Sequence, residues 1–520
     1  MVSKLNKDLK LIAKSSFIVF LGLALSKVLV YVFRIIVARH FGPEVYGLFA
    51  LSLMISGWFI TISLLGLYEG ILRYIPMYRG KKQDERVKFV FGIITKVQVV
   101  SGIVSGVLLF FLYGFIAINI FDNENLVVFL KVFSFVAAFS VISSPFITVL
   151  RAYEKIGWYS FISSVGHNIL KVLFIVIFIV LGFNSNAVSF SFLIGTFGTL
   201  ILAYFVAKYK LPRIFSKSNL ESEEKSDISK EVFSYSLPLL FSSFLFSIFH
   251  WVDSFSIGYY KGALEVGFYN AAIPIAMLLT LAPEFFMKLF YPIINKEYSR
   301  ENIQVIRELS KQVGKWIFII NLPLFIILFI FPEVVLNILF GSEYTVSSSA
   351  LRLLSISSFM VSFTGMISHK LVTMIGKSKL VLFNVVIAGT LNVILNILLV
   401  PMEKILFIDN SLGINGAAIA TLLSMILLMS LFSIESKYYL SILPFRRKMF
   451  MIFLASIVPT FLLYYLRKMF VVDFLTFVLF SSFFFLLYII SILLIKGLDK
   501  NDMLILSSIK KKILGKRVKK

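Results

Sequence analysis

The sequence predicts an all-α integral membrane protein with about fourteen transmembrane helices, arranged as two parallel six-helix lobes around a central cleft plus two C-terminal helices. The first observation is composition, because 59% of the 520 residues are hydrophobic and only 15% are charged. The mean hydropathy of +0.93 is far above that of a soluble domain. The other two observations are a series of apolar runs and a hairpin motif that occurs twice.

The apolar runs define the transmembrane helices. A helix needs about 20 apolar residues to cross the hydrocarbon core of a bilayer, and Gly, Pro, Asn or charged residues separate runs of about that length. The first run begins the whole series, which favours a membrane helix over a cleaved signal peptide. The predicted spans are 15–37, 45–70, 88–118, 126–149, 158–182, 187–207, 232–258, 267–292, 314–340, 348–371, 380–400, 413–436, 449–466 and 472–495.

The distribution of charge orients these spans. A formal net charge of +24 would suit a nucleic-acid-binding protein, but the basic residues cluster in alternate loops. With the N-terminus inside, 37 Lys and Arg residues fall in cytoplasmic loops and tails, and 5 fall in outer loops. This bias follows the positive-inside rule. We therefore expect a multi-pass protein of the cytoplasmic cell membrane, with cytoplasmic N- and C-termini and no nucleic-acid partner.

A hairpin between two apolar runs occurs twice along the chain. The stretch 34–50 resembles the stretch 254–270, which lies six spans further on. Two glycines align in each copy, Gly42 with Gly262 and Gly47 with Gly267. Because six is an even number, both copies enter the membrane in the same orientation. A membrane chain built from two parallel repeats is typical of a transporter.

The repeat and the polar breaks between spans predict the domains. The longest polar break has the charge-rich segment 221–227 at its centre, and it separates two groups of six spans. We expect an N-terminal lobe over 1–209, a cytoplasmic linker over 210–230, a C-terminal lobe over 231–440, spans thirteen and fourteen within 441–497, and a basic cytoplasmic tail over 498–520.

Three motifs carry a resemblance to a known family. The first motif runs from Arg34 to Gly47 and includes Arg39 and Gly42-Pro43-Glu44. The second runs from Val252-Asp253 to Tyr269 and includes Gly267. The third consists of Asn392, Asn396 and Pro401, followed by Gly413 and Gly416. In this order they resemble the polysaccharide-type flippases of the multidrug/oligosaccharidyl-lipid/polysaccharide exporter superfamily. The resemblance implies movement of a lipid-linked saccharide from the cytoplasmic to the outer leaflet. It also implies a carrier that is a polyprenyl phosphate or pyrophosphate.

Ionisable residues inside spans are the candidate functional residues, because a charge in the membrane is costly unless it is paired or hydrated. Lys27 and Arg34 lie well inside the first span, and their spacing of seven places them on one helix face with Tyr31 between them. One interpretation is a cationic wall for the anionic headgroup of a lipid-linked saccharide, where Arg34 offers two parallel donors. The other is an internal ion pair that fixes helix packing.

Span seven supplies an opposite charge. Asp253 lies at the edge of a polar stripe that includes His250, and the repeat alignment places Asp253 at the depth of Arg34. We expect Asp253 and Arg34 to form a gate that pairs when the cleft is closed to the outside and separates as it opens. The alternatives are a static structural pair and a lone aspartate that faces water. His250 is a candidate for proton relay or a simple hydrogen-bonded side chain. Asn392 and Asn396, one turn apart, are expected to join helices by hydrogen bonds.

A further carboxylate, Glu284, lies in span eight beside Pro283. It is a candidate site for a coupling cation, H+ or Na+, or a partner for Lys288 one turn on. Apart from this ion, the expected partners are membrane lipid and an anionic lipid-linked saccharide, and the protein is expected to be a monomer. We expect no cofactor and no bound metal, since the chain has no cysteine and no nucleotide-binding loop.

Two other functions stay open. A membrane glycosyltransferase or polymerase would need a sizeable loop with a carboxylate pair or a metal cluster, and the loops offer none, so we expect a transporter and not an enzyme. A cation-coupled multidrug exporter of the same superfamily would place acidic groups where its cationic substrates bind. Span one carries Lys27 and Arg34 and no carboxylate, which favours an anionic substrate.

Overall fold

The computed structural model describes residues 2–402, 412–495 and 497, with side chains from Leu25 onward except Leu289. The basic tail predicted over 498–520 lies outside the described residues. Within these ranges all regular structure is helical, and no strand is present. The chain forms two compact units, one made of residues 1–270 and 395–417 and the other of residues 271–394 and 418–520.

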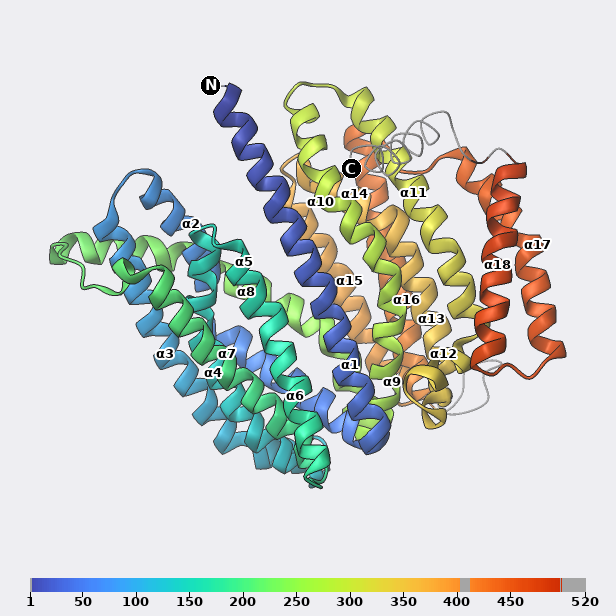
Figure 1. Ribbon diagram of the computed structural model, residues 1–520, viewed down its shortest axis with the longest axis horizontal. Coiled ribbons are helices and arrows are strands. Elements are labelled where there is room, and N and C mark those ends of the chain that lie inside the picture. The colour runs from blue at the N-terminus through green and yellow to red at the C-terminus, as the bar shows by residue number, and fades with distance from the viewer. Residues whose placement is uncertain (1, 403–411, 496, 498–520) are drawn as a thin grey trace, which may run out of the picture. The chain divides into compact units, whose positions relative to one another are not determined.

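The first unit contains the first eight helices, just over half of α9 and the junction of α15 and α16 (Figure 1). Short 3-10 or π segments join several helices, at Phe115–Ile120, Phe161–Gly166 and Pro212–Phe215. The helices are α1 (Val2–Ser63), α2 (Leu67–Gly80), α3 (Asp84–Gly114), α4 (Asn125–Ala152), α5 (Ile156–Ser160), α6 (His167–Val180), α7 (Asn186–Lys210), α8 (Ser222–Lys261) and α9 (Ala263–Met277).

The second unit contains the remaining helices (Figure 1). Its short 3-10 or π segments are Leu278–Thr280, Ser342–Ser347 and Val361–Gly365. Its helices are α10 (Leu281–Tyr298), α11 (Ile303–Ile330), α12 (Pro332–Leu339), α13 (Ser348–Met360), α14 (Met366–Met374), α15 (Ser378–Leu399), α16 (Gly413–Leu440), α17 (Arg447–Met469) and α18 (Phe474–Leu494).

The predicted fold class is confirmed. Thirteen helices of the described chain are long and apolar enough to cross a membrane. They match the fourteen predicted spans one by one, except that the first of them, Leu25–Ser63, overlaps both of the first two spans, 15–37 and 45–70. Two helical stretches of α1 meet at a kink at Gly42, where the backbone leaves the helical conformation. The difference in number is therefore a matter of where one helix ends and the next begins.

The linker predicted over 210–230 is partly helix and is fastened to the first unit. The helix α8 begins inside it at Ser222, because Ile228 is buried in the same apolar cluster as residues of α2 and α3. Ser218 Oγ donates to the carbonyl of Glu85 over 2.9 Å, and Arg86 pairs with Glu224 over 2.6 Å. The lobe boundary at this segment stays a prediction.

Small residues allow close helix packing in the first unit. The helix α4 packs between α3 and α7, and a Cβ added at Gly106 of α3 would lie 2.9 Å from the Cβ of Ala138 on α4. In membranes such contacts replace the hydrophobic effect as the force that holds helices together. The order of the helices therefore depends on glycine and alanine as much as on the larger apolar residues.

The C-terminal helices α17 and α18 lie side by side and pack on α11 in the second unit (Figure 1). Asp473 caps α18, since its carboxylate accepts a hydrogen bond from the backbone nitrogen of Thr476 over 2.8 Å. The hydroxyl of Thr476 donates to the same carboxylate over 2.6 Å. These hydrogen bonds hold the pKa of the Asp473 carboxyl below its usual value.

Candidate functional site

The two copies of the repeated hairpin have the same backbone geometry. Gly42 has φ 81° and ψ 175°, and Gly262 has φ 87° and ψ 179°. Side chains disfavour this region of φ, so glycine is required at the end of each helix. The next helix starts directly after each glycine. The sequence repeat is therefore a structural repeat, and both copies lie in the first unit.

The two hairpins pack directly on each other. A Cβ added at Gly47 would overlap the carbonyl of Ala263, and one added at Gly267 would overlap the carbonyl of Pro43. Because Pro43 and Ala263 are themselves equivalent in the repeat, each copy makes the same contact with the other. Such a reciprocal contact is the pattern of a local two-fold axis. The backbones meet here with no side chain between them.

Arg34 connects the first copy to the second. Its side chain is half-buried in α1, and its Nη1 donates to the hydroxyl of Tyr46 over 3.3 Å. The Tyr46 hydroxyl, which belongs to a buried side chain, donates in turn to the backbone carbonyl of Asn270 over 3.2 Å. Asn270 Nδ2 also donates to Ser254 Oγ over 3.0 Å. Arg34 of the first hairpin is thus linked to Asn270 of the second hairpin through the hydroxyl of Tyr46.

Asp253 accepts hydrogen bonds from side chains of two other helices, α9 and α15. Its Oδ2 accepts from the hydroxyl of Tyr269 over 2.6 Å, and its Oδ1 accepts from Asn396 Nδ2 over 2.8 Å. Asn392, one turn before Asn396, donates to Thr421 on α16 over 3.3 Å. The expectation that these two asparagines join helices is confirmed. The pairing of Arg34 with Asp253 as a gate stays a prediction.

Lys171 is the residue that sequence reasoning did not single out. It lies on α6 with a side chain only 7% exposed, and Arg34 is close enough to interact with it electrostatically. Its Nζ lies 4.4 Å from the ring centroid of Phe192 and 5.6 Å from that of Phe33. No carboxylate pairs with Lys171 among the described residues. Its position in the middle of the predicted span 158–182 is the sequence feature that could have identified it as a candidate.

The other predicted residues divide between the units. Lys27 and Tyr31 are half-buried on the same face of α1 as Arg34, and His250 of α8 is exposed within electrostatic reach of Asp253 and Arg34. These residues belong to the first unit, whereas Glu284 lies half-buried on α10 in the second. In the part of the chain that is described, no group of three His, Asp or Glu side chains could hold a metal ion.

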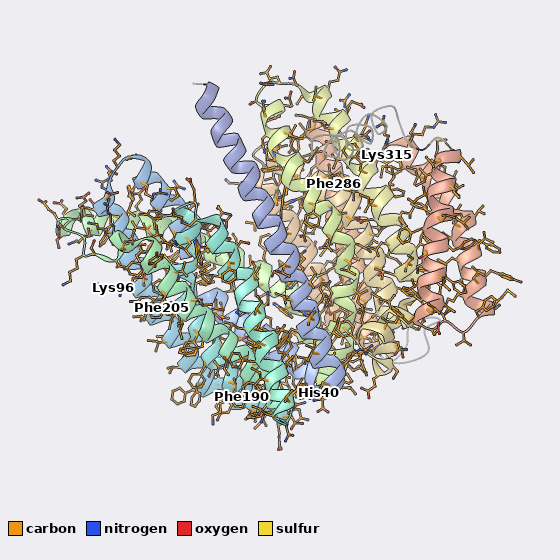
Figure 2. All side chains as sticks on the ribbon, viewed as in Figure 1. His40, Lys96, Phe190, Phe205, Phe286 and Lys315 are labelled. Atoms are coloured by element: carbon orange, nitrogen blue, oxygen red, sulfur yellow. The ribbon has the colours of Figure 1, made fainter. Side chains whose placement is uncertain are left out.

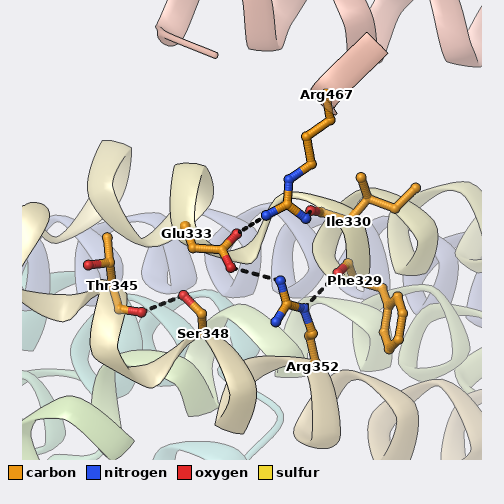
Figure 3. Close-up of polar contacts among 7 residues, drawn as sticks. All are labelled: Phe329, Ile330, Glu333, Thr345, Ser348, Arg352 and Arg467. Carbon is orange, nitrogen blue, oxygen red and sulfur yellow. Dashed lines mark hydrogen bonds and ion pairs between the residues drawn. The ribbon is translucent and has the colours of Figure 1, made fainter. Parts of the chain in front are cut away.

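A second charged cluster, in the second unit, has a structural role. The carboxylate of Glu333 pairs with Arg352 over 2.7 Å and with Arg467 over 2.8 Å (Figure 3). Both arginines also donate to backbone carbonyls near the end of α11, Arg352 to Phe329 and Arg467 to Ile330. All three side chains are satisfied by one another, and the cluster fastens α17 to α12 and α13.

The first unit therefore holds two neighbouring cations, Arg34 and Lys171, inside apolar helices. A guanidinium has five N–H donors, and Arg34 uses one of them on Tyr46. Cations in a low-dielectric surrounding attract anions far more strongly than they would in water. This arrangement suits the binding of a phosphate or another compact anion.

Fold, repeat and cation pair together define a membrane transporter of two repeats. Residues 12–297 match the family described as polysaccharide biosynthesis protein, and residues 238–398 match the MatE family. The chain belongs to the polysaccharide biosynthesis protein family. It is accordingly a multi-pass member of the multidrug/oligosaccharidyl-lipid/polysaccharide exporter superfamily, as the three motifs imply.

The chain is also similar to known membrane proteins along most of its length. An uncharacterized membrane protein of Methanocaldococcus jannaschii is 22% identical over 405 residues, which is 75% of this chain and 77% of the relative. The lipid II flippase MurJ in an inward closed conformation has a TM-score of 0.69 at 16% identity, covering 96% of this chain and 99% of its own. An inward-facing multidrug resistance transporter of the MATE family has a TM-score of 0.65 at 18% identity, covering 80% and 94%. These likenesses concern the fold.

Proposed function

We propose that this protein is a flippase for an oligosaccharide linked to a polyprenyl phosphate or pyrophosphate. It moves this lipid from the cytoplasmic to the outer leaflet by alternating access, for the assembly of a surface polysaccharide or glycan. The observation that carries the proposal is the pair Arg34 and Lys171, two cations in apolar helices with no carboxylate partner among the described residues. A charge placed there without a counter-charge is expensive unless it serves a ligand.

The headgroup is assigned to the face of α1. Lys27, Tyr31 and Arg34 share this face, and Arg34 keeps the donors needed for a bidentate contact with a phosphate. Lys171, held between two phenylalanine rings, adds a second positive charge next to Arg34. The saccharide and the polyprenyl chain are not assigned to residues.

The outer gate is assigned to the paired hairpins. Gly47 and Gly267 touch the opposite backbone when the hairpins are together, and the bridge from Arg34 through Tyr46 to Asn270 spans the same junction. In the proposed cycle, opening toward the outside separates the hairpins, breaks the bridge from Arg34 through Tyr46 to Asn270, and frees the Arg34 guanidinium for the phosphate. His250 and Glu284 are the candidates for coupling to H+ or Na+.

The test is a flipping measurement with a substituted arginine. Arg34→Ala, reconstituted in vesicles with a lipid-linked oligosaccharide in the outer bilayer leaflet and assayed for protection from a membrane-impermeant reagent, should lose at least about tenfold in rate. A bidentate charged hydrogen bond is worth about 1.5–3 kcal/mol. Arg34→Lys should recover part of the loss. The control is Arg300→Ala, which changes an exposed arginine paired with Glu297. Equal rates for all variants would contradict the proposal.

The match of residues 238–398 to the MatE family favours one alternative, a cation-coupled multidrug exporter. Such a protein would export cationic compounds, and its binding would be weakened by Arg34 and Lys171 instead of strengthened. In cells that express it, Arg34→Ala should then leave or raise drug export and have no effect on lipid-linked saccharides. The flippase proposal expects the opposite pattern.

A further inference from the structure

We propose that α7 and α5 of the first unit form a binding site for an anionic phospholipid of the membrane in which the protein resides. The site has an apolar part and a basic part, as the two ends of such a lipid require. It lies on helices other than α1 and does not depend on what the protein transports.

The apolar part is a stripe along α7. Phe197, Ile201, Phe205 and Tyr209 recur every four residues, so they share one helix face. Their exposed fractions are 44%, 40%, 62% and 78%, and Figure 2 labels Phe205 on this helix. Phe161, at the start of the π segment after α5, is exposed as well. This stripe presents aromatic and aliphatic surface of the kind that packs along a lipid chain.

The basic part lies where α7 ends. The Nζ of Lys210 is 4.6 Å from the ring centroid of Tyr209 and 5.3 Å from that of Trp158 on α5. The Nζ of Lys208 donates to the hydroxyl of Tyr204 over 3.4 Å. Neither lysine pairs with a carboxylate among the residues that the structure describes. Both ammonium groups therefore keep donors for a phosphate.

The charge and the aromatic residues together identify the occupant. Tryptophan and tyrosine at a helix end are typical of the membrane–water interface, and basic residues beside them attract anionic lipid headgroups. A soluble phosphate would use the lysines and leave the apolar stripe uncovered. A zwitterionic lipid would cover the stripe and leave the lysines without a net opposite charge. An anionic phospholipid covers both parts.

The test uses Trp158 as the reporter. The chain has 4 tryptophans, so the variant with Trp58→Phe, Trp251→Phe and Trp316→Phe keeps Trp158 alone. Its fluorescence is measured in mixtures of a brominated anionic lipid, phosphatidylglycerol, with unlabelled phosphatidylcholine, and then with the label on the other lipid. Each cation near the surface is worth about fivefold in affinity for an anionic lipid. With two lysines the preference for phosphatidylglycerol at Trp158 should therefore approach about 25-fold, and Lys208→Gln with Lys210→Gln should bring it close to one.

Matched controls separate the site from general membrane charge. Lys88→Gln and Lys311→Gln remove the same charge from lysines that pair with Glu85 and Glu308, and the preference at Trp158 should stay. A variant that keeps only Trp316, in the second unit, should show the weaker preference of the bulk membrane. Thermal unfolding confirms that each variant is folded.

Three results would overturn the proposal. Equal quenching by the two brominated lipids would show a site without headgroup selectivity. A preference that survives the double lysine substitution would place the anion elsewhere. Displacement of phosphatidylglycerol by equimolar polyprenyl phosphate would assign the site to the substrate carrier instead.

Discussion

At the scale of single residues, the question is whether Arg34 and Lys171 stabilise the fold or bind a ligand. Arg34 is fixed by Tyr46, whose hydroxyl rests on the second hairpin. The ammonium group of Lys171 lies over the rings of Phe33 and Phe192, whereas a structural lysine usually pairs with a carboxylate. A cation over an aromatic face gains about 0.5–2 kcal/mol, whereas a lysine at the membrane centre costs roughly 2.5–3.5 kcal/mol. The two rings together are worth about 1–4 kcal/mol, comparable to this cost, so the energetics alone do not separate a structural role of Lys171 from ligand binding.

Replacing Lys171 tests this comparison. Lys171→Met keeps an unbranched side chain that is one atom shorter and removes the charge, so we expect an unchanged or higher melting temperature together with a flipping rate that is at least about fivefold lower. The melting temperature is measured in detergent and the rate in vesicles. A lower melting temperature with a normal rate would mean that the cation–π contact is structural. Lys288→Met is a suitable control, because Lys288 also lies over a phenylalanine ring.

At the scale of elements, the paired hairpins are the part that a transporter would have to separate. They meet backbone to backbone, and the reciprocal contact of Gly47 with Ala263 and Gly267 with Pro43 leaves no room for a Cβ. A side chain at either glycine must therefore push the two copies apart. Overpacking of this kind costs about 1–3 kcal/mol.

Gly47→Ala should shift the protein toward the state in which the hairpins are apart. The chain has no cysteine, so Ser254→Cys provides a single label at a buried position beside the contact. We expect a membrane-impermeant maleimide to label it about 5–150 times faster in Gly47→Ala than in the parent, which corresponds to the 1–3 kcal/mol of overpacking. Gly92→Ala is the control, because an added Cβ there meets nothing within 4 Å. Unchanged labelling would mean that the hairpins do not form a gate.

At the scale of the whole molecule, the thirteen apolar helices and the distribution of Lys and Arg define a topology. The predicted orientation places the segment between α7 and α8 inside and the segment between α12 and α13 outside. Both segments are exposed in the structure, at Ser216 and at Ser342. The family and the fold agree with a multi-pass membrane protein, and the orientation is the part that needs a measurement.

Labelling of single cysteines measures this orientation. In intact cells, Ser342→Cys should react with a membrane-impermeant maleimide, and Ser216→Cys should react only after the membrane is opened. The reason is the excess of Lys and Arg near Ser216, which the positive-inside rule retains in the cytoplasm. The reverse pattern would invert the topology and with it the proposed direction of transport.

Sequence reasoning reached the fold and part of the site. The spans and the repeat follow from composition and spacing, and Arg34 stands out because it is a charge within an apolar run. The contact of Asn396 with Asp253 joins residues 143 positions apart, and that of Tyr46 with Asn270 joins residues 224 apart. No pattern along the chain specifies such pairs. The sequence shows that Lys171 is a charge within a span. Only the structure shows that no carboxylate of the described residues pairs with it.

The sequence by itself determined the class of fold, the positions of the apolar segments that cross the membrane, and the presence of two copies of one hairpin. These features are local, since a bilayer selects helices by the length and hydrophobicity of each segment. Only the tertiary structure decided that the two hairpins touch, that Arg34 is joined to the second copy through Tyr46, and that Lys171 lies beside Arg34. Such contacts arise when helices from distant parts of the chain pack, and the close approach of glycine backbones becomes visible only then.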